Sequence, residues 1–186
     1  GGQLASLEKY PQFANYLAKH ESLLKKRHTA KKSPKAWYKT IDRVYPSLTS
    51  TPKLLIPDIK GVATVVFDAG SYYPHHNLYV ITSDTWDLQA LQAFLKSSIA
   101  LTFVAAYCVR MAGGFLRFQA QYLRRIRVPM WQELTASQRR SLLSVANSTD
   151  QDAIDEVVFS ILELPLAAVK KIRAFAQAAR VGKKRA

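Results

Sequence analysis

Hydrophobic positions change their spacing along the chain, and each spacing predicts a type of element. Near the N-terminus they recur every three or four residues, which predicts a helix over residues 11–28. In the middle they form short runs bounded by glycine and proline, which predicts strands over 53–57, 63–67 and 78–81. Helical spacing then returns from Trp86 onward.

The second half of the chain is expected to be mainly helical. Asp84 or Thr85 is a candidate cap for a helix that runs to Leu95, because a short polar side chain accepts hydrogen bonds from the first free N–H groups. Further helices are predicted over 99–111, 134–145, 152–162 and 166–179.

These elements predict an α+β protein with two parts. A mixed sheet module with flanking helices is expected over residues 1–130. A helical C-terminal extension with a frayed basic tail is expected over 131–186. The boundary is placed near Met130, where strand-like texture gives way to helical texture.

A paired glycine at 113–114 introduces a segment in which arginines recur. Large apolar side chains alternate from Phe115 to Phe118, as in a half-buried strand, and a second arginine-rich segment reaches Pro129. We expect an arginine-rich strand pair that begins at a Gly-Gly turn and faces phosphate. A hairpin with solvated arginines is an equal alternative. The arginines of interest are Arg117, Arg124 and Arg125.

Charge directs attention to a polyanionic partner. Lys plus Arg number 27 against 13 Asp plus Glu, a net charge of +14, and the sequence pI is about 10.0. Nucleic acid is the expected polyanion, with an anionic membrane as the competitor. The sequence has no apolar run of the roughly 20 residues that span a bilayer, so we expect no membrane partner. A single cysteine, Cys108, fits a reducing cytoplasm, and Gly1-Gly2 suggests an excised fragment.

The densest positive stretch runs from residue 25 to residue 39. From Lys19 to Lys39, eight basic side chains are opposed only by Glu21, and this excess of positive charge favours neutralisation by phosphate. A solvated helix end and loop is the alternative, because cations near a helix C-terminus suit its dipole without any ligand. The candidate phosphate contacts are Lys25, Lys26, Arg27, Lys31, Lys32 and Lys35, together with Arg124 and Arg125 further along the chain.

Taken in order, several segments resemble the TaqI-like C-terminal specificity domain of adenine-specific DNA methyltransferases in bacterial restriction-modification systems. The segments that carry the resemblance are Tyr16-Leu17, 24–27, Trp37-Tyr38, 53–59, 68–73, 77–81 and 113–129, followed by 154–159 with Leu164. The resemblance implies sequence-specific recognition of double-stranded DNA. It also implies a catalytic domain of the same chain as partner, with S-adenosylmethionine and an Asn-Pro-Pro-aromatic motif on that domain.

No cofactor is expected on this chain. The Asn-Pro-Pro-aromatic motif is missing from its sequence. Asp68-Ala69-Gly70 follows a strand-like run, as in a cofactor loop, but the second loop glycine is absent and Tyr72-Tyr73-Pro74 follows. We expect an ordinary loop there and a non-catalytic reader of DNA sequence.

The loop after residue 70 offers stacking faces and groups that hydrogen-bond to the edges of bases. The adjacent histidines with Asp68 also suggest a metal site, but no third ligand lies at a supporting spacing. We expect groove contacts from Tyr72, Tyr73, His75, His76 and Asn77, together with Arg117.

Two other functions compete with DNA reading. An adaptor would dock a partner subunit on its C-terminal helices through Leu142, Leu143, Val158, Ile161 and Leu162. A metal-dependent nuclease would use Asp42, Asp58 and Lys60, the last two in a short acid-x-Lys element.

Overall fold

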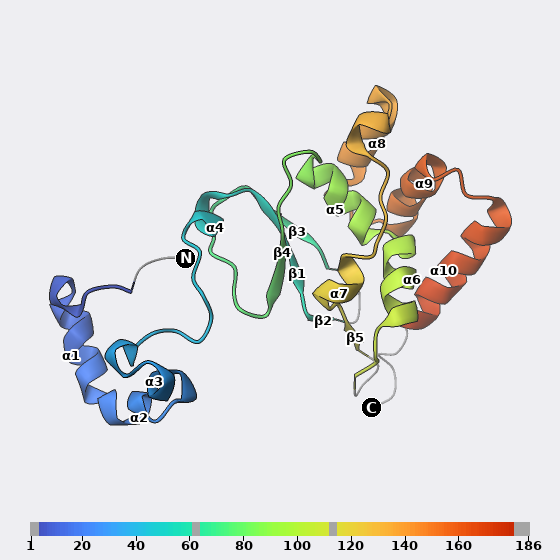
Figure 1. Ribbon diagram of the computed structural model, residues 1–186. Helices are drawn as coiled ribbons and strands as arrows, with labels where there is room; N and C mark the ends of the chain where they lie inside the picture. The colour runs from blue at the N-terminus through green and yellow to red at the C-terminus, as the bar shows by residue number, and fades with distance from the viewer. Residues whose placement is uncertain (1–3, 61–63, 112–114, 181–186) are drawn as a thin grey trace. The chain divides into compact units, whose positions relative to one another are not determined.

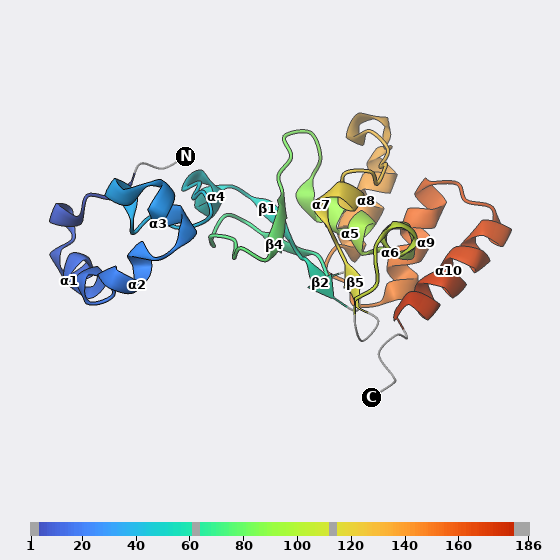
Figure 2. The same ribbon diagram turned by 60° about the horizontal axis from the view of Figure 1, so that its bottom comes forward.

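The computed structural model describes residues 4–60, 64–111 and 115–180, with only the main chain at Ile59 and Lys60. Contacts divide the chain into two compact units, Gly1–Ser47 and Leu48–Ala186, and each is described by itself. Figures 1 and 2 show the elements of both.

The first unit is built from short helices. They are α1 (Pro11–Lys19), α2 (Glu21–Lys25) and α3 (His28–Lys32), with 3-10 turns at Leu7–Lys9 and Pro34–Ala36. The single helix predicted over 11–28 is wrong, because the helical conformation is interrupted at His20 and again at Arg27, which is extended. At the second break the Arg27 guanidinium binds the carbonyl oxygens of Trp37 and Lys39, which stabilises the return of the chain.

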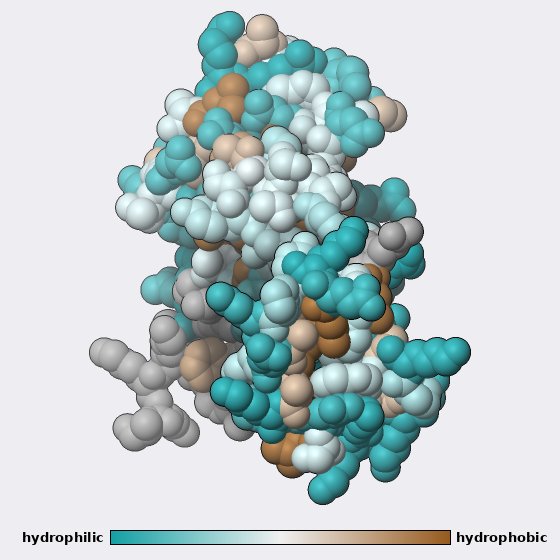
Figure 3. All heavy atoms as spheres, turned by 90° about the vertical axis from the view of Figure 1, so that its left-hand side faces the viewer, coloured by the Kyte–Doolittle hydropathy of each residue, from teal (hydrophilic) through white to brown (hydrophobic). Residues whose placement is uncertain are grey.

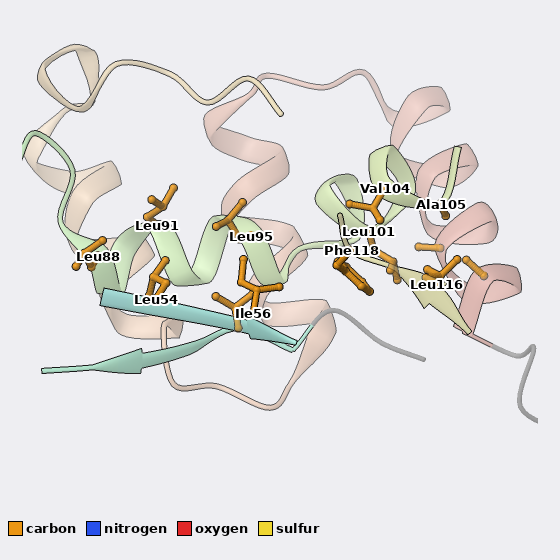
Figure 4. Packing of buried hydrophobic residues seen from close by; sticks show 13 residues of the cluster. Leu54, Ile56, Leu88, Leu91, Leu95, Leu101, Val104, Ala105, Leu116 and Phe118 are labelled. Carbon is orange, nitrogen blue, oxygen red and sulfur yellow. The ribbon is translucent and has the colours of Figure 1, made fainter. Parts of the chain in front are cut away.

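The second unit contains a three-stranded antiparallel sheet in the order β3-β1-β4. Its strands are β1 (Lys53–Pro57), β3 (Val66–Asp68) and β4 (Leu78–Ile81), close to the three predicted runs. Leu54 and Ile56 are buried on one face of β1 and point toward α5 (Leu88–Lys96) in Figure 4. The opposite face is partly exposed, as is common for an antiparallel sheet.

Two consecutive helices cover the buried face of the sheet. Asp87 caps α5 by accepting the N–H groups of Gln89 and Ala90, so the caps predicted at Asp84 or Thr85 are wrong. Ser83 explains the later start, because its hydroxyl accepts the N–H groups of residues 85 and 86 in a turn. The next helix, α6 (Ser98–Tyr107), ends before the predicted residue 111 because Cys108 is extended.

The prediction of an arginine-rich strand pair is wrong for its second segment. One short strand, β5 (Leu116–Arg117), does form and pairs antiparallel with β2 (Ile59–Lys60). Residues 120–123 form helix α7 (Ala120–Leu123), and 124–130 carry no strand. Leu123, Ile126 and Val128 pack against the core. Leu123 and Ile126 are three positions apart, whereas residues on one face of a strand are an even number of positions apart. Gly113-Gly114 lies outside the described residues.

Three helices complete the second unit: α8 (Ala136–Val145), α9 (Gln151–Ile161) and α10 (Leu166–Arg180). A reciprocal capping box between Thr135 and Gln138 starts α8. In Figures 1 and 2, α5 and α6 lie between the sheet and these helices. The α+β prediction is confirmed. The predicted division near Met130 stays a prediction, although α8 to α10 share hydrophobic cores with α5 and α6.

Across residues 4–60, 64–111 and 115–180, no single helix has the length and apolarity to cross a membrane. Only α5 and α6 taken together have that length and apolarity, and the two helices meet at a bend of 62°.

Candidate nucleic-acid interface

Asp58 lies at the point where one extended segment exchanges its pairing partner. Its N–H donates to the carbonyl oxygen of Asn77 at 3.1 Å, which extends the pairing of β1 with β4. Its own carbonyl oxygen accepts the N–H of Phe118 at 2.7 Å, which continues the pairing of β2 with β5. The main chain of Asp58 therefore joins the end of the 71–77 loop to the segment that carries Arg117.

The side chain of Asp58 strengthens this junction. Its Oδ2 accepts from Nε of Arg117 at 3.2 Å, and its Oδ1 accepts from the hydroxyl of Tyr79 at 3.3 Å. Burial raises the pKa of Tyr79, and the negative charge of Asp58 raises it further, so the phenol is a neutral donor. Arg117 remains 41% exposed although it is ion-paired. The carboxylate thus orients a guanidinium that solvent, or a ligand, can reach.

The loop that connects β3 to β4 presents the predicted polar and aromatic side chains to solvent. Tyr72 is 71% exposed, and only Pro74 of the segment 71–77 is buried. Nδ1 of His75 lies 2.7 Å from Oδ1 of Asn77, and the rings of His75 and His76 lie 4.1 Å apart. Figures 1 and 2 place the chain that enters β4 on the side of the sheet away from α5 and α6.

The carboxylate of Asp68, in the segment Asp68-Ala69-Gly70, already has partners within the chain. The Asp68 carboxylate pairs with Lys53 and accepts the N–H groups of Ser71 and Tyr72. The bond with Lys53 is the main reason why the pKa of Asp68 lies below its usual range. The Asp68 carboxylate is thus engaged within the chain, by an internal ammonium and by the N–H groups of its own loop.

The predicted phosphate-binding lysines belong to the first unit, and their surroundings differ. Lys25 is bridged to Glu21 at 2.6 Å and its ammonium lies 5.8 Å from the ring centre of Trp37. The Nη2 of Arg27 bonds to main-chain oxygens, as described above. Figure 3 shows hydrophilic side chains over most of the face it presents, with smaller apolar patches between them. The remaining predicted lysines are exposed: Lys26, Lys31, Lys32 and Lys35.

Arg124 and Arg125 follow α7 on the second unit and are exposed. The guanidinium of Arg125 lies 5.1 Å from the ring centre of Tyr107, which is itself about half exposed. Such stacking holds an arginine at modest energetic gain while its charge remains available to an anion.

The acids of the nuclease alternative are not gathered into a described metal site. Asp42 belongs to the first unit and Asp58 to the second, where Arg117 and Tyr79 engage it. The side chain of Lys60 lies outside the described residues. Among the residues that the structure does describe, no group of three or more His, Cys, Asp or Glu side chains is placed to hold a metal ion.

Most of the apolar residues of the adaptor alternative are used within the chain. Leu142 and Val158 are fully buried in a cluster with Ala90, Ala93 and Phe94 of α5. Ile161 and Leu162 are partly buried against the same cluster, and Leu143 is 39% exposed. A docking surface made of all five residues is therefore not present on the second unit.

Sequence reasoning missed the residues that hold the candidate interface in place. Asp58 was weighed as a nuclease acid, whereas its partners give it an orienting role. Lys53 is the first residue of the predicted strand 53–57 and is fully buried. A lysine at the start of an apolar run was the sequence feature that could have indicated a buried charge. Tyr79 carried no comparable sign, because a tyrosine is common in any strand.

Comparison with known proteins agrees with the resemblance. The model of the TaqI-like C-terminal specificity domain matches residues 8–128. The type II methyltransferase M.XhoI of Xanthomonas vasicola is 52% identical over 163 residues, which are 88% of this chain and 30% of that protein. M.PaeR7I of Pseudomonas aeruginosa is 51% identical over 163 residues, 88% of this chain and 28% of its own length.

A third type II methyltransferase, M.BstVI of Geobacillus stearothermophilus, is 41% identical over 172 residues, 92% of this chain and 31% of that protein. The chain thus spans a little under a third of the length of each of these relatives. The matched family agrees with the family expected from the order of the motifs, and the chain belongs to the TaqI-like C-terminal specificity domains.

Proposed function

We propose that this chain recognises a specific sequence in double-stranded DNA for a type II restriction-modification methyltransferase that modifies adenine at N6. One observation carries the proposal beyond family membership. Asp58 links Asn77, at the end of an exposed polar loop, to the half-exposed Arg117. A loop and a guanidinium held at one place provide the two kinds of group that read base edges in a groove.

Arg117 is proposed to read a base directly. A guanidinium matches the O6 and N7 acceptors of guanine through two parallel hydrogen bonds. The Asp58 carboxylate engages Nε, so the pair orients the plane of the guanidinium before DNA arrives. The loop side chains Tyr72, Tyr73, His75, His76 and Asn77 are proposed to contact the same groove.

Phosphate contacts are proposed for the basic side chains of both units. Such contacts fix the register of a protein on the duplex without reading sequence. The exposed lysines 26, 31, 32 and 35 suit this role best. Lys25 and Arg27 are proposed to contribute charge while they also order their own segment. Arg124 and Arg125 would act on the second unit.

The methyl transfer itself is proposed to take place on a catalytic domain of the same chain. That domain would bind S-adenosylmethionine and hold the adenine after it leaves the base stack, because chemistry on a base requires its extrusion from the duplex. The present segment would bind no cofactor and no membrane. We place the reaction in the bacterial cytoplasm, where the DNA lies.

Methylation by the intact enzyme tests the assignment of Arg117. Methylated positions in a random-sequence plasmid library define the target, and single-base variants of that target are then compared. Arg117→Ala is expected to cost about 1–3 kcal/mol at the target and to relax specificity at one base pair. Arg173→Ala is the matched control, because Arg173 is also paired with an aspartate and is 37% exposed.

The two variants separate reading from structure. Arg173→Ala is expected to leave the pattern of methylated sequences unchanged. If Arg117→Ala reduced methylation of every variant target equally and lowered the melting temperature, Arg117 would hold the junction together rather than read DNA.

A further inference from the structure

Lys53 is a buried charge in a position where an apolar side chain would be ordinary. Its side chain is fully buried at the start of β1, on the face opposite Leu54 and Ile56. The ammonium binds the carboxylate of Asp68, its cross-strand partner, and donates to the carbonyl oxygen of Thr51 at 3.1 Å. A buried ion pair is often replaceable by apolar residues without loss of stability, so stability alone is a weak reason for it.

Asp68 connects this ion pair to the first residues of the exposed loop. Its Oδ1 accepts the N–H of Ser71 at 3.2 Å, and its Oδ2 accepts the N–H of Tyr72 at 3.4 Å while it also faces Lys53. One carboxylate therefore receives the ammonium from the strand and two main-chain donors from the loop. The direction in which the chain leaves β3 depends on that acceptor.

Gly70 adds an independent constraint on the same turn. Its φ of +99° is a conformation that other residues rarely adopt. A Cβ at this position would lie 2.5 Å from the carbonyl oxygen of Ser50, at the end of α4 (Ser47–Ser50). The turn after β3 is thus held against the main chain of residue 50 as well as by Asp68.

The far end of the loop is held in a similar way. β3 and β4 flank β1, with Asp68 opposite Lys53 and Leu78 opposite Pro57, so the loop leaves near one end of β1 and returns near the other. At the return, Asn77 accepts the N–H of Asp58, whose carboxylate binds Arg117. Asp68, the last residue of β3, and Asp58, directly after β1, thereby fix where the loop begins and where it ends.

We propose that Lys53 and Asp68 are positioning residues for DNA recognition: they fix the start of the 71–77 loop so that its side chains lie in register with Arg117. This inference rests on the proposed function of the loop. Lys53 acts through Asp68, which acts through the N–H groups of Ser71 and Tyr72, and neither charged group contacts DNA.

Two double variants of the intact methyltransferase separate positioning from stability. In Lys53→Met with Asp68→Asn, the ion pair is gone but an amide oxygen still accepts one of the two loop N–H groups. In Lys53→Met with Asp68→Leu, the ion pair and the acceptor are both gone. The measurements are the melting temperature, the affinity for non-target duplex DNA, and methylation of the target relative to its single-base variants.

The Asn double variant is expected to keep the wild-type preference for the target. The Leu double variant is expected to lose about ten- to a hundredfold of that preference, the range of one or two base contacts. Its affinity for non-target DNA should stay unchanged, because that affinity depends on phosphate contacts. Equal preference in both double variants would overturn the proposal.

A further substitution covers the case in which the Leu double variant does not fold. Gly70→Ala forces the turn away from Ser50 without touching either charged residue, and it should lower the preference for the target at unchanged non-target affinity. Wild-type preference in Gly70→Ala would then overturn the proposal.

Direct variants of the loop distinguish this failure from failure of the proposed function. If Tyr72→Ala and Asn77→Ala leave the preference for the target unchanged, the loop does not read DNA and the proposed function of the loop fails. If they lower it while the positioning variants do not, the loop reads DNA but Lys53 and Asp68 do not position it.

Discussion

Nε of Arg117 donates to Oδ2 of Asp58 across 3.2 Å, and this ion pair joins residues that lie 59 positions apart in the sequence. Asp58 is 21% exposed and Arg117 41%, so the pair lies at the surface without being fully solvated. Partial exposure keeps its contribution to stability small. Its main effect is geometric, because a paired guanidinium has fewer orientations to lose on binding a ligand, which is proposed to be a base.

Asp58→Asn and Asp58→Ala should weaken the orientation of the Arg117 guanidinium to different degrees. Asn keeps an oxygen that accepts from Nε, whereas Ala removes it, so the loss of specificity at the base read by Arg117 should be larger for Ala. We expect Asp58→Ala to approach the effect of Arg117→Ala, about 1–3 kcal/mol. Methylation of single-base target variants measures the effect. A full loss in Asp58→Asn together with no loss in Asp58→Ala would contradict the orienting role.

The lysines of α3 should contribute affinity without specificity. Lys31→Gln with Lys32→Gln removes two adjacent exposed charges, which should weaken binding to all duplexes about equally and reduce the slope of log affinity against log salt by about 2. Fluorescence anisotropy at several salt concentrations measures both quantities. The control is Lys170→Gln with Lys171→Gln, two adjacent exposed lysines of α10. An equal change of slope in the control would show that overall charge, not this segment, determines binding.

Leu142 and Leu143 are neighbours in α8 with opposite environments. Comparing them tests the hydrophobic cluster that Leu142 forms with Ala90, Ala93 and Phe94. Leu142 is fully buried and Leu143 is 39% exposed. Leu142→Ala should lower the free energy of unfolding by about 2–5 kcal/mol through lost burial and the cavity left behind. Leu143→Ala should cost well under half as much. Denaturant unfolding of the two variants checks this, and similar losses would contradict the burial of Leu142 against α5.

Acid should weaken the anchor at the start of the loop. Hydrogen bonding with Lys53 lowers the pKa of Asp68, and the N–H groups of Ser71 and Tyr72 lower it further, against the opposing effect of burial. Because the folded pKa is depressed, the stabilisation is fully present above the unfolded value of about 3.9 and is lost as pH falls through the folded pKa.

Melting temperatures followed into acid test this dependence. The double variant Lys53→Met with Asp68→Asn lacks the titrating carboxylate, so the wild type should lose stability relative to it at the most acid pH values. Parallel curves for the two proteins would mean that Asp68 does not contribute an ionisation-dependent stability.

The sequence was informative where structure follows from neighbours in the chain. The runs at 53–57 and 78–81 form strands, and the helix predicted over 134–145 forms as α8. The strand tendency of each run and the helix start both depend on residues within a few positions of one another. The strand prediction for 122–129 is wrong because the structure of this segment depends on distant residues. Its arginines suggested a strand, but Leu123 and Ile126 pack into a core made by distant helices.

The exposed residues of the candidate site were named from the sequence, and their role in recognition stays a prediction, whereas the residues that support them were not found. Tyr72 and Asn77 were identifiable because aromatic and amide groups beside a turn are suited to recognition. The role of Asp58 depends on the pairing of Ile59 with Arg117, and the role of Lys53 on the pairing with Asp68. Strand register between distant segments is set by the whole fold, so no local pattern revealed these partners.

The anchoring of the 71–77 loop at both ends has a consequence for how specificity could diverge. The anchors Asp68, Gly70 and Asp58 lie outside the loop, and they act on its main chain or on Arg117. Apart from the buried Pro74, the side chains of residues 72–76 can be exchanged without loss of those bonds. If the loop reads DNA as proposed, point substitutions at its exposed positions can change the target sequence while the main chain of the loop keeps its place.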